Sequence, residues 1–576
     1  LEIPGIGSIG LTVQSQSNLG TAVDYPRLNP SENRFQFADS LTWTFGRHTA
    51  KFGVDIMSTE DYVDTLYGGV GAYNYGTFTN FALDFSGNTA GGKRLQSYSQ
   101  SFGNRLVDFT TKDYGFYAQD QFRIGPSLTL NYGIRYDYTA VPQPSVTNPD
   151  YPATGNINSA GKNFSPRVGL AYTFNNSRTV LRAGYGIFYA RLHTSMISNL
   201  FTNNGVYQKS LSLQGTNPSD LALGPVWPTQ LAGLDRTPPA GTVDVFFASK
   251  DLRNPYTQQG NVAIEHELTR DMGITASYIW SRGLQLFVTE DMNVGAPSGP
   301  VTYRINDASR NQVGTYTVPA TYLLANRIDK RWRRLVVLRN GMNSWYNGLA
   351  LQLRKRMSKG MEYSVAYTWS HAIDTGVGAG NDNVFFSSVN TVRPGDIGDR
   401  QSGALDQRHR LAVTHLWSPT FTKREGVIAR YLINNWQLAQ IWTAGSSFAS
   451  TATVSVTGAP FTGAAFNSTL NGYGASFPGN RVPFWPARTL NTGAMWRADA
   501  RVSKILPFSE RYKLFLNFEA FNVMNNTYYT SVNSLAYAAS GGVLTPQVGL
   551  GAGSATQGFP DGTNARRAQF SMRFIW

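Results

Sequence analysis

The chain has 576 residues, of which 41% are apolar, 13% are aromatic and only 15% are charged. Globular proteins average about 25% charged residues, and disordered tails and coiled coils are charge-rich, so this composition excludes those two classes. Cysteine is absent and the formal charge is +14, which excludes disulfides and thiol nucleophiles and is compatible with anionic partners. Lysine and arginine form no dense basic run, so we expect no nucleic acid partner.

The chain contains no predicted membrane-spanning helix and no recognisable leader. No run of 18 apolar residues occurs, and the first five residues lack a basic-then-apolar signal. We therefore expect a chain that has been processed or cut from a longer one.

Alternation of apolar and polar residues is the main local pattern. Between Leu128 and Thr139, leucine, tyrosine and isoleucine occupy the even positions, and polar residues or glycine mainly occupy the odd ones. Successive side chains of a strand point to opposite sides, so this segment is predicted to be a strand with one apolar face. Similar runs predict sixteen strands, near residues 8–14, 35–45, 48–57, 112–123, 127–139, 165–174, 178–189, 257–268, 272–283, 347–357, 361–371, 409–418, 433–444, 496–505, 511–522 and 567–576.

The predicted strands are long, and short and long connections alternate between them. Most strands have 10–13 residues, whereas strands of soluble sheets have about 5–6 and a tilted strand crossing a bilayer needs about 9–11. Short turns such as 46–47 alternate with long links such as 190–256. The exception is 419–432, which stands where a short turn is expected but is too long for a tight turn. This layout is typical of an all-β, antiparallel up-and-down transmembrane barrel with both termini on the short-turn side. A large soluble β-sandwich or propeller with an aromatic core is the alternative.

The polar face of the predicted strands is expected to line the barrel lumen. Its arginines are candidates for attracting anionic ligands, or for pairing with lumen acids such as Asp137, Glu362 and Asp499 or with a plug. These lumen candidates are Arg135, Arg182, Arg354, Arg497 and Arg501.

The last predicted strand carries a possible assembly signal. Phe570, Phe574 and the terminal Trp576 share one face, and the chain stops on an aromatic residue. This ending resembles the signal by which the barrel assembly machinery recognises outer-membrane barrels, although any edge strand can end in tryptophan. Aromatic residues near other strand ends suit contact with the lipid bilayer and lipopolysaccharide.

Several segments resemble the barrel of TonB-dependent outer-membrane receptors, in particular the Oar-like group with carboxypeptidase-regulatory-like domains. The resemblance is carried by residues 114–122, 128–138, 164–172, 181–189, 346–353, 363–370, 406–410, 517–522 and the terminal strand. It implies a 22-stranded barrel filled by a plug that contacts TonB. We therefore interpret residues 1–34 as an N-terminal segment continuing an upstream part, and 35–576 as a barrel whose plug is absent from this chain. A self-contained, passive 16-stranded pore remains the alternative.

Aromatic residues in the long connections are candidate ligand contacts. They stand among glycine and asparagine, a combination that can stack on and hydrogen-bond sugars, peptides or siderophores. Alternatively, the loops pack on one another over the barrel mouth. The candidates are Tyr67, Tyr73, Tyr75, Trp227 and Trp485.

Other chemistry is weakly supported. His409 and His415 share a strand face without a carboxylate pattern for zinc, and Asp396, Asp399 and Asp406 lack the spacing of an EF-hand calcium loop. No G-x-S-x-G, H-E-x-x-H or Walker A motif occurs, so we expect no metal, no cofactor and no enzyme. The resemblance implies TonB-energised uptake of a large nutrient of the siderophore, oligosaccharide or peptide class across the bacterial outer membrane. The rivals are a passive pore, a surface adhesion or structural barrel, and a soluble β-rich enzyme or carbohydrate-binding protein.

Overall fold

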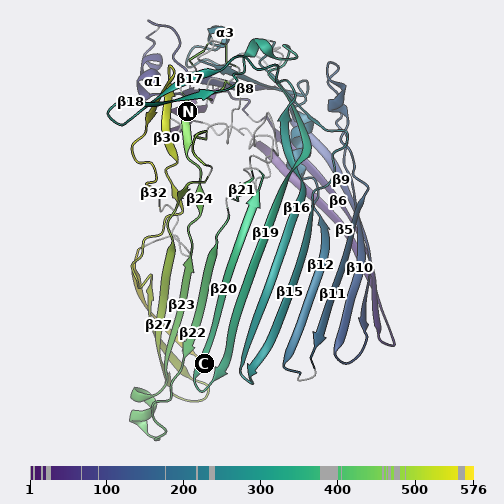
Figure 1. Ribbon diagram of the computed structural model, residues 1–576, viewed down its shortest axis with the longest axis vertical. Coiled ribbons are helices and arrows are strands. Elements are labelled where there is room, and N and C mark those ends of the chain that lie inside the picture. The colour runs from purple at the N-terminus through teal and green to yellow at the C-terminus, as the bar shows by residue number, and fades with distance from the viewer. Residues whose placement is uncertain are drawn as a thin grey trace.

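The computed structural model of the chain is dominated by one large antiparallel sheet of long, tilted strands (Figure 1). It describes all residues except 1, 4–6, 9, 14–16, 21–26, 67, 89, 175–176, 216–217, 232–239, 376–399, 404, 457–459, 462, 465–468, 473–480, 487 and 555–564.

The large sheet is a barrel whose long strands follow one another in chain order, with β33 followed by β5 around the barrel. Two short strands, β14 (Asp244–Ala248) and β21 (Gln401–Ser402), add to it. The long strands are β5 (Arg27–Phe45), β6 (His48–Thr65), β9 (Leu106–Arg123), β10 (Leu128–Ala140), β11 (Asn163–Thr173), β12 (Thr179–Tyr189), β15 (Tyr256–Thr269), β16 (Met272–Asp291), β19 (Arg334–Ser358), β20 (Met361–Asp374), β22 (His409–Trp417), β23 (Trp436–Gly445), β27 (Met495–Pro507), β28 (Lys513–Phe521) and β33 (Arg567–Ile575).

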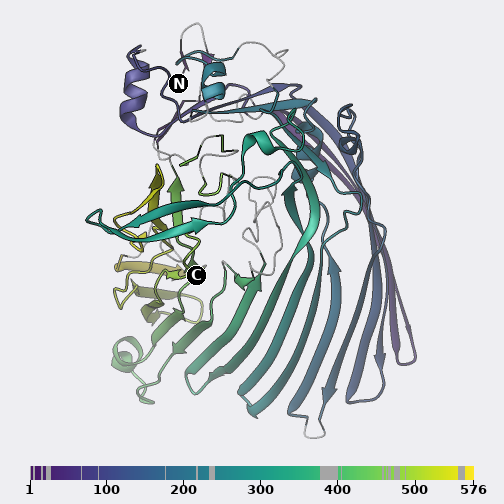
Figure 2. The same cartoon turned by 45° about the horizontal axis from the view of Figure 1, so that its top comes forward.

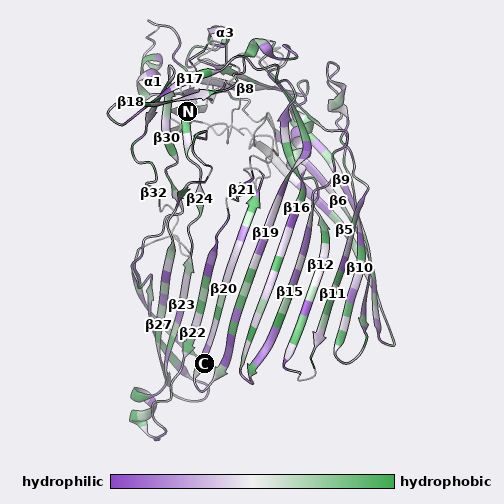
Figure 3. Cartoon of the chain, viewed as in Figure 1, coloured by the Kyte–Doolittle hydropathy of each residue, from purple (hydrophilic) through white to green (hydrophobic). Residues whose placement is uncertain are grey.

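Antiparallel registers confirm the predicted division into two faces. Tyr132 of β10 pairs with Asp120 of β9 and with Val168 of β11, so these three side chains lie on the same side of the sheet. Following the registers from β5 to β33 places the predicted apolar sets on one continuous outer face and the predicted polar sets on the other. Figure 3 shows the resulting alternation of apolar and polar residues along the strands.

The prediction of sixteen barrel strands is one strand too high. Fifteen of the predicted runs correspond to the long strands or to parts of them. The run 8–14 instead contributes the end of β2 (Gly7–Ser8) and the whole of β3 (Gly10–Val13), and the four residues of β3 pair in parallel with β7 (Ala72–Tyr75) outside the barrel. A strand of that length is too short to cross a bilayer. Because the count is odd, β5 and β33 run in the same direction, and no residue register joins these two strands in the described part of the chain.

The predicted placement of both termini on the short-turn side is half right. The C-terminus lies at the short-turn end, but the N-terminus lies at the opposite end among the long connections (Figure 1). This follows from the position of β3, which is tied to β7 in the connection between β6 and β9.

The outer face exposes large apolar side chains in a continuous band. On β5 alone, Phe35, Phe37 and Leu41 are each more than 60% exposed. A soluble monomer rarely exposes such a surface, whereas lipid requires it. On β27, eight residues separate Trp496 near the long connections from Lys504, which is level with Trp436. That is about 27 Å along the strand, or roughly 21 Å of height at a tilt of about 40°. The height is close to that of the apolar band of an outer-membrane barrel, about 25 Å.

The long connections fold into two small sheets with cores of their own. The first has the order β13-β8-β7-β3-β4, and the second β18-β17-β31-β30-β25. Figure 2 shows the second sheet bringing the teal β17–β18 hairpin beside yellow strands from near the C-terminus. Their strands are β4 (Ser17–Gly20), β8 (Ser97–Gly103), β13 (Gln208–Gln214), β17 (Val301–Asn306), β18 (Gln312–Val318), β25 (Thr453–Val456), β30 (Leu535–Ser540) and β31 (Val543–Pro546).

The remaining elements are short. None of the helices in the described residues is long and apolar enough to span a membrane. They are α1 (Phe78–Phe85), α2 (Thr194–Thr202), α3 (Pro218–Leu223), η1 (Pro152–Gly155), η2 (Leu324–Asn326) and η4 (Ala429–Ile433), beside the two-residue strands β1 (Glu2–Ile3), β2 (Gly7–Ser8), β24 (Ala449–Ser450), β26 (Leu490–Asn491), β29 (Ser531–Val532) and β32 (Gly553–Ser554).

Candidate functional site: a cationic wall inside the barrel

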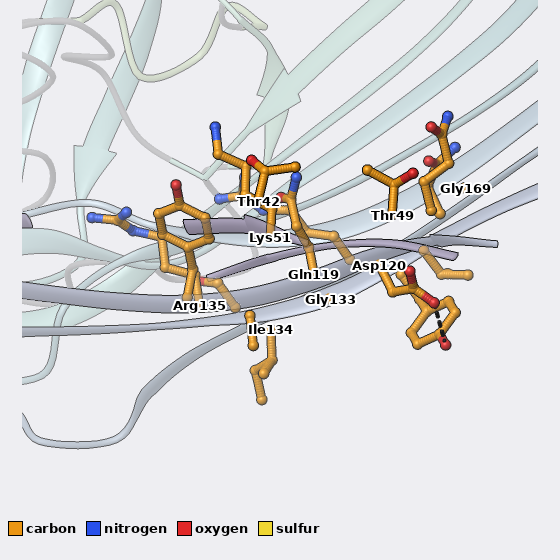
Figure 4. Close-up of a pocket in the computed structure, with 17 residues that line it drawn as sticks. Thr42, Thr49, Lys51, Gln119, Asp120, Gly133, Ile134, Arg135 and Gly169 are labelled. Atoms are coloured by element: carbon orange, nitrogen blue, oxygen red, sulfur yellow. Dashed lines mark hydrogen bonds between the residues drawn. The ribbon is translucent and has the colours of Figure 1, made fainter. Parts of the chain in front are cut away.

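A cavity of about 620 Å³ lies against the barrel wall formed by β5, β6, β9, β10 and β11. Figure 4 shows Thr42, Lys51 and Gln119 on one side of these strands, with Ile134 and Asp120 on the other. The polar side is the inner face defined by the registers. Its other polar residues at the cavity include Thr49, Gln121, Asn131, Arg135, Ser165 and Arg167.

Arg135 is the best-anchored cation of this wall. Its Nε donates to both oxygens of Asp137 at 2.8 and 3.0 Å, and its Nη2 lies 3.7 Å from Asp55 Oδ2. The guanidinium lies over the neighbouring strand, where residue 115 is glycine. Two carboxylates therefore share one guanidinium, and little of its charge is left for a ligand.

Lys51 and Arg167 are the cations of this cavity whose charge is not neutralised by an acidic partner among the described residues. Neither forms an ion pair with any residue that the structure describes, and Arg167 instead places its guanidinium 4.4 Å from the ring centroid of Phe188. Both line the same cavity. This part of the inner wall therefore presents net positive charge to the lumen, which suits an anionic group on a ligand.

The other predicted lumen arginines also lie on the inner face, mostly in ion pairs. Arg182 contacts Glu265 at 2.9 Å, Arg497 contacts Asp499 at 3.0 Å, and Arg501 is 3.8 Å from Glu519. Arg354 lines a second cavity, of about 640 Å³, near the short turns, together with two further arginines and three acidic residues, Arg178, Arg356, Glu265, Glu267 and Asp271. These four arginines therefore lie on a wall of mixed charge, unlike Lys51 and Arg167.

The aromatic residues predicted to contact a ligand lie mainly in a core. Tyr73, Tyr75 and Trp227 are each less than 10% exposed and pack together in the first small sheet. Trp485 is half-buried against the core of the second small sheet, and Tyr67 lies outside the described residues. Tyr73, Tyr75 and Trp227 therefore fit the alternative interpretation, in which the loops pack on one another. A ligand can reach these three rings only if the first small sheet opens.

Polar bonds tie the first small sheet together. The Tyr73 hydroxyl donates to the Thr229 carbonyl at 2.5 Å, and the Tyr75 hydroxyl donates to Asp84 at 3.1 Å. Asp84 also pairs with Arg94 at 3.0 Å. Burial raises the pKa of both tyrosines well above the ordinary value, with a further contribution from nearby charge, so both remain neutral donors at physiological pH.

A buried charge cluster anchors β14 to β19 above the barrel. Asp244 is 7% exposed and contacts Arg333 Nη2 at 2.5 Å and Arg334 Nη2 at 2.6 Å. Burial alone would raise the pKa of Asp244, but the two guanidiniums outweigh it and hold the pKa well below its usual range. The carboxylate therefore stays charged and pins two segments that are about ninety residues apart in sequence.

The candidate metal ligands do not come together. His409 donates to or accepts from the Tyr367 hydroxyl at 2.9 Å, whereas His415 lies six residues away, about 20 Å along the strand, beside Gln440. Asp406 is buried and accepts from the backbone N–H of Ala372, and Asp396 and Asp399 lie outside the described residues. In the described part of the chain, no three histidine or acidic side chains are grouped for a metal ion.

Two useful residues were missing from the predicted lumen set. Lys51 and Arg167 stand on the polar faces of the predicted strands 48–57 and 165–174, so alternation alone could have placed both in the lumen. The sequence carries no sign that they lack acidic partners, because those partners depend on which strands become neighbours.

Long, tilted strands that are antiparallel in chain order from β5 to β33, with an apolar band outside and charged groups inside, define an integral outer-membrane β-barrel. The chain belongs to the outer membrane beta barrel domain family, whose model matches residues 3–567. Its location is the bacterial outer membrane.

Known proteins are similar to this chain over part of their length. The chain is 22% identical over 372 residues to the TonB-dependent transporter Oar of Myxococcus xanthus, covering 59% of this chain and 31% of that protein. The outer membrane transporter YddB of Escherichia coli is similar with 10% identity and a TM-score of 0.49, covering 91% of this chain and 55% of that one. The siderophore receptor PirA of Acinetobacter baumannii has 11% identity and a TM-score of 0.46, covering 94% and 54%. The chain thus spans about a third of the curated relative and about half of these structures.

Proposed function

We propose that this protein forms the barrel of an outer-membrane transporter that takes up a large nutrient with energy delivered through TonB. The observation that carries the proposal is the similarity of 372 residues to a TonB-dependent transporter. In this proposal TonB acts through a plug that is not among residues 35–576.

The inner wall supports a nutrient that carries anionic groups. Lys51 and Arg167 face the lumen without acidic partners among the described residues and line one cavity. An anionic group entering this site would gain charge-assisted hydrogen bonds without displacing an existing ion pair. Among the siderophore, oligosaccharide and peptide classes, this favours members with carboxylates or other acidic groups.

Energy dependence tests the proposal. The natural full-length protein is expressed in cells whose own transporters have been deleted, and uptake of a panel of labelled ferric siderophores, acidic oligosaccharides and peptides is measured. We expect accumulation of at least one compound, lost when TonB is deleted or the proton gradient is collapsed. Uptake that persists without TonB would identify a passive pore. Binding to cells with no uptake of any compound would favour an adhesion or structural role.

A further inference from the structure

One connection on the short-turn side is unlike the others. Residues 418–435 join β22 to β23, whereas the turn at 46–47 has two residues and the turn at 359–360 also has two. The segment was the one poor fit to the alternation of short and long links, and the barrel layout does not require it. Figure 1 shows it as a helical projection at the lower left, below β22 and β27.

This segment, which we call the foot (residues 419–435), has a defined structure. The N–H of Asn434 donates to the Ala429 carbonyl at 2.9 Å and completes the π-helical turn η4. The side chain of Asn434 also accepts from the Thr422 N–H at 3.1 Å and donates to the Thr422 carbonyl at 2.7 Å. This two-way bond closes the foot on itself, so its surface is presented in a fixed arrangement.

The foot is attached to the lipid-facing side of the barrel rim. Trp436 Nε1 donates to the Leu432 carbonyl at 3.0 Å, and Lys504 Nζ donates to the same carbonyl at 3.3 Å. Phe421 packs edge-on against Trp417, with ring centroids 5.9 Å apart. The registers place Trp417, Trp436 and Lys504 on the outer face. The foot therefore projects outward over the lipid and not over the lumen.

The outward surface of the foot combines exposed apolar and basic residues. Val427 is 74% exposed, and Ile428 and Leu432 are each 66% exposed. Lys423, Arg424 and Arg430 are also exposed, with Glu425 as the one exposed acid of the foot. Apolar side chains beside basic groups are typical of elements that lie in the interface of an anionic membrane.

We propose that the foot is an interfacial anchor that inserts Val427, Ile428 and Leu432 into the periplasmic leaflet and binds anionic phospholipid headgroups. The level of the foot relative to the membrane surface is set by its contacts with Trp417 and Trp436, because tryptophan is typical of the membrane–water boundary. Lys423, Arg424 and Arg430 supply the donors for lipid phosphate, and arginine can bind phosphate in a bidentate manner. The partner of this surface is the lipid because the foot is attached to side chains that face the lipid.

Single-cysteine labelling can test the insertion, because the natural chain has no cysteine. The variants Ile428→Cys and Leu432→Cys are labelled with the fluorophore NBD in the otherwise unchanged protein and reconstituted in phosphatidylethanolamine–phosphatidylglycerol vesicles. Vesicles containing doxyl-labelled lipid should quench both labels severalfold. Phe518→Cys on the outer face is the membrane-embedded control, and Lys359→Cys in another short turn is the aqueous control.

The charges are tested by a second variant, Lys423→Gln/Arg424→Gln/Arg430→Gln, in the Ile428→Cys background. In the parent, quenching should be stronger with phosphatidylglycerol than with phosphatidylethanolamine alone, and this difference should vanish in the charge variant. The proposal is overturned if label 428 behaves like label 359 in vesicles. If label 428 is then shielded only in intact cell envelopes, the foot binds a periplasmic protein and not lipid.

Discussion

A β-carbon added to Gly115 would lie 2.3 Å from Nη2 of Arg135, which occupies the space above that glycine. The two residues belong to neighbouring strands, and the missing side chain lets the guanidinium lie flat on β9 while it binds Asp137. The position of Arg135 on the cavity wall thus depends on a glycine of the adjacent strand.

Gly115→Ala should therefore displace Arg135 without breaking the barrel. The atom that the new β-carbon would crowd, Nη2 of Arg135, is at the end of a flexible side chain. The guanidinium can therefore move away, and it then loses its forked hydrogen bond (the fork) to the two oxygens of Asp137. We expect a loss of about 1–2 kcal/mol in the free energy of unfolding, measured by urea titration in lipid vesicles. Gly169→Ala is the matched control, because its added β-carbon would meet nothing closer than 3.6 Å. An equal loss in both variants would show that the fork is not responsible.

Removing the two lumen cations should weaken binding of anions. Lys51→Gln and Arg167→Gln each delete a positive charge that lacks an acidic partner among the described residues. Calorimetric titration with citrate, a small polycarboxylate, should show affinity falling about threefold to tenfold for each variant, with a smaller difference at high salt. Lys112→Gln, on the outer face of β9, should leave citrate affinity unchanged. A comparable loss in Lys112→Gln would instead indicate a general effect of net charge.

Neutralising Asp244 should loosen the connection of β14 to β19. Asp244→Asn leaves Arg333 and Arg334 buried without their carboxylate, and breaking such a pair costs about 3–5 kcal/mol. Amide hydrogen exchange of β14 should accelerate, while the strands of the barrel keep their protection. Arg331→Gln is the control, because Arg331 is 55% exposed and its ion pairs are worth about 0–1 kcal/mol.

The same carboxylate predicts a pH dependence. The pKa of Asp244 is lowered in the folded protein, so its stabilisation is complete above the unfolded value of about 3.9 and is lost as pH falls through the lower folded value. Protection of β14, corrected for the intrinsic exchange rate, should be constant from pH 7 to about pH 4.5 and then fall. In Asp244→Asn this fall should be absent, and its persistence would assign the acid sensitivity to another group.

The outward aromatics of the last strand should govern assembly. Phe570 and Phe574 are exposed on the outer face of β33, Trp576 directly after the strand is also exposed, and Phe574 stacks on Tyr512 of the preceding short turn. Phe574→Ala should reduce the amount of folded protein in outer-membrane fractions severalfold, measured by the heat-dependent gel mobility of barrels. Arg573→Ala, on the inner face of the same strand, should leave the yield near that of the parent. Equal yields for the two variants would argue against an assembly signal in these rings.

Alternation in the sequence determined the barrel wall. The face of the residues in the fifteen predicted runs follows from local period-two patterns, and the division into short turns and long links follows from the spacing between them. The extensions of β6, β16 and β19 beyond these runs lie in segments that were predicted to be links. The registers place Arg135, Arg182 and Arg497 on the inner face, which is the face that alternation predicts for them. A side chain in a strand points to one side or the other whatever its neighbours are, so no long-range information is needed.

Only the tertiary structure decided what the connections do. Gly10–Val13 pairs with β7 and not with a barrel strand, and β17 lies beside β31, more than two hundred residues further along the chain. Those pairings bury Tyr73 instead of exposing it to a ligand, and comparable packing turns residues 419–435 outward to the lipid. The reason is physical: burial and charge pairing depend on which distant segments meet, and no local pattern specifies that.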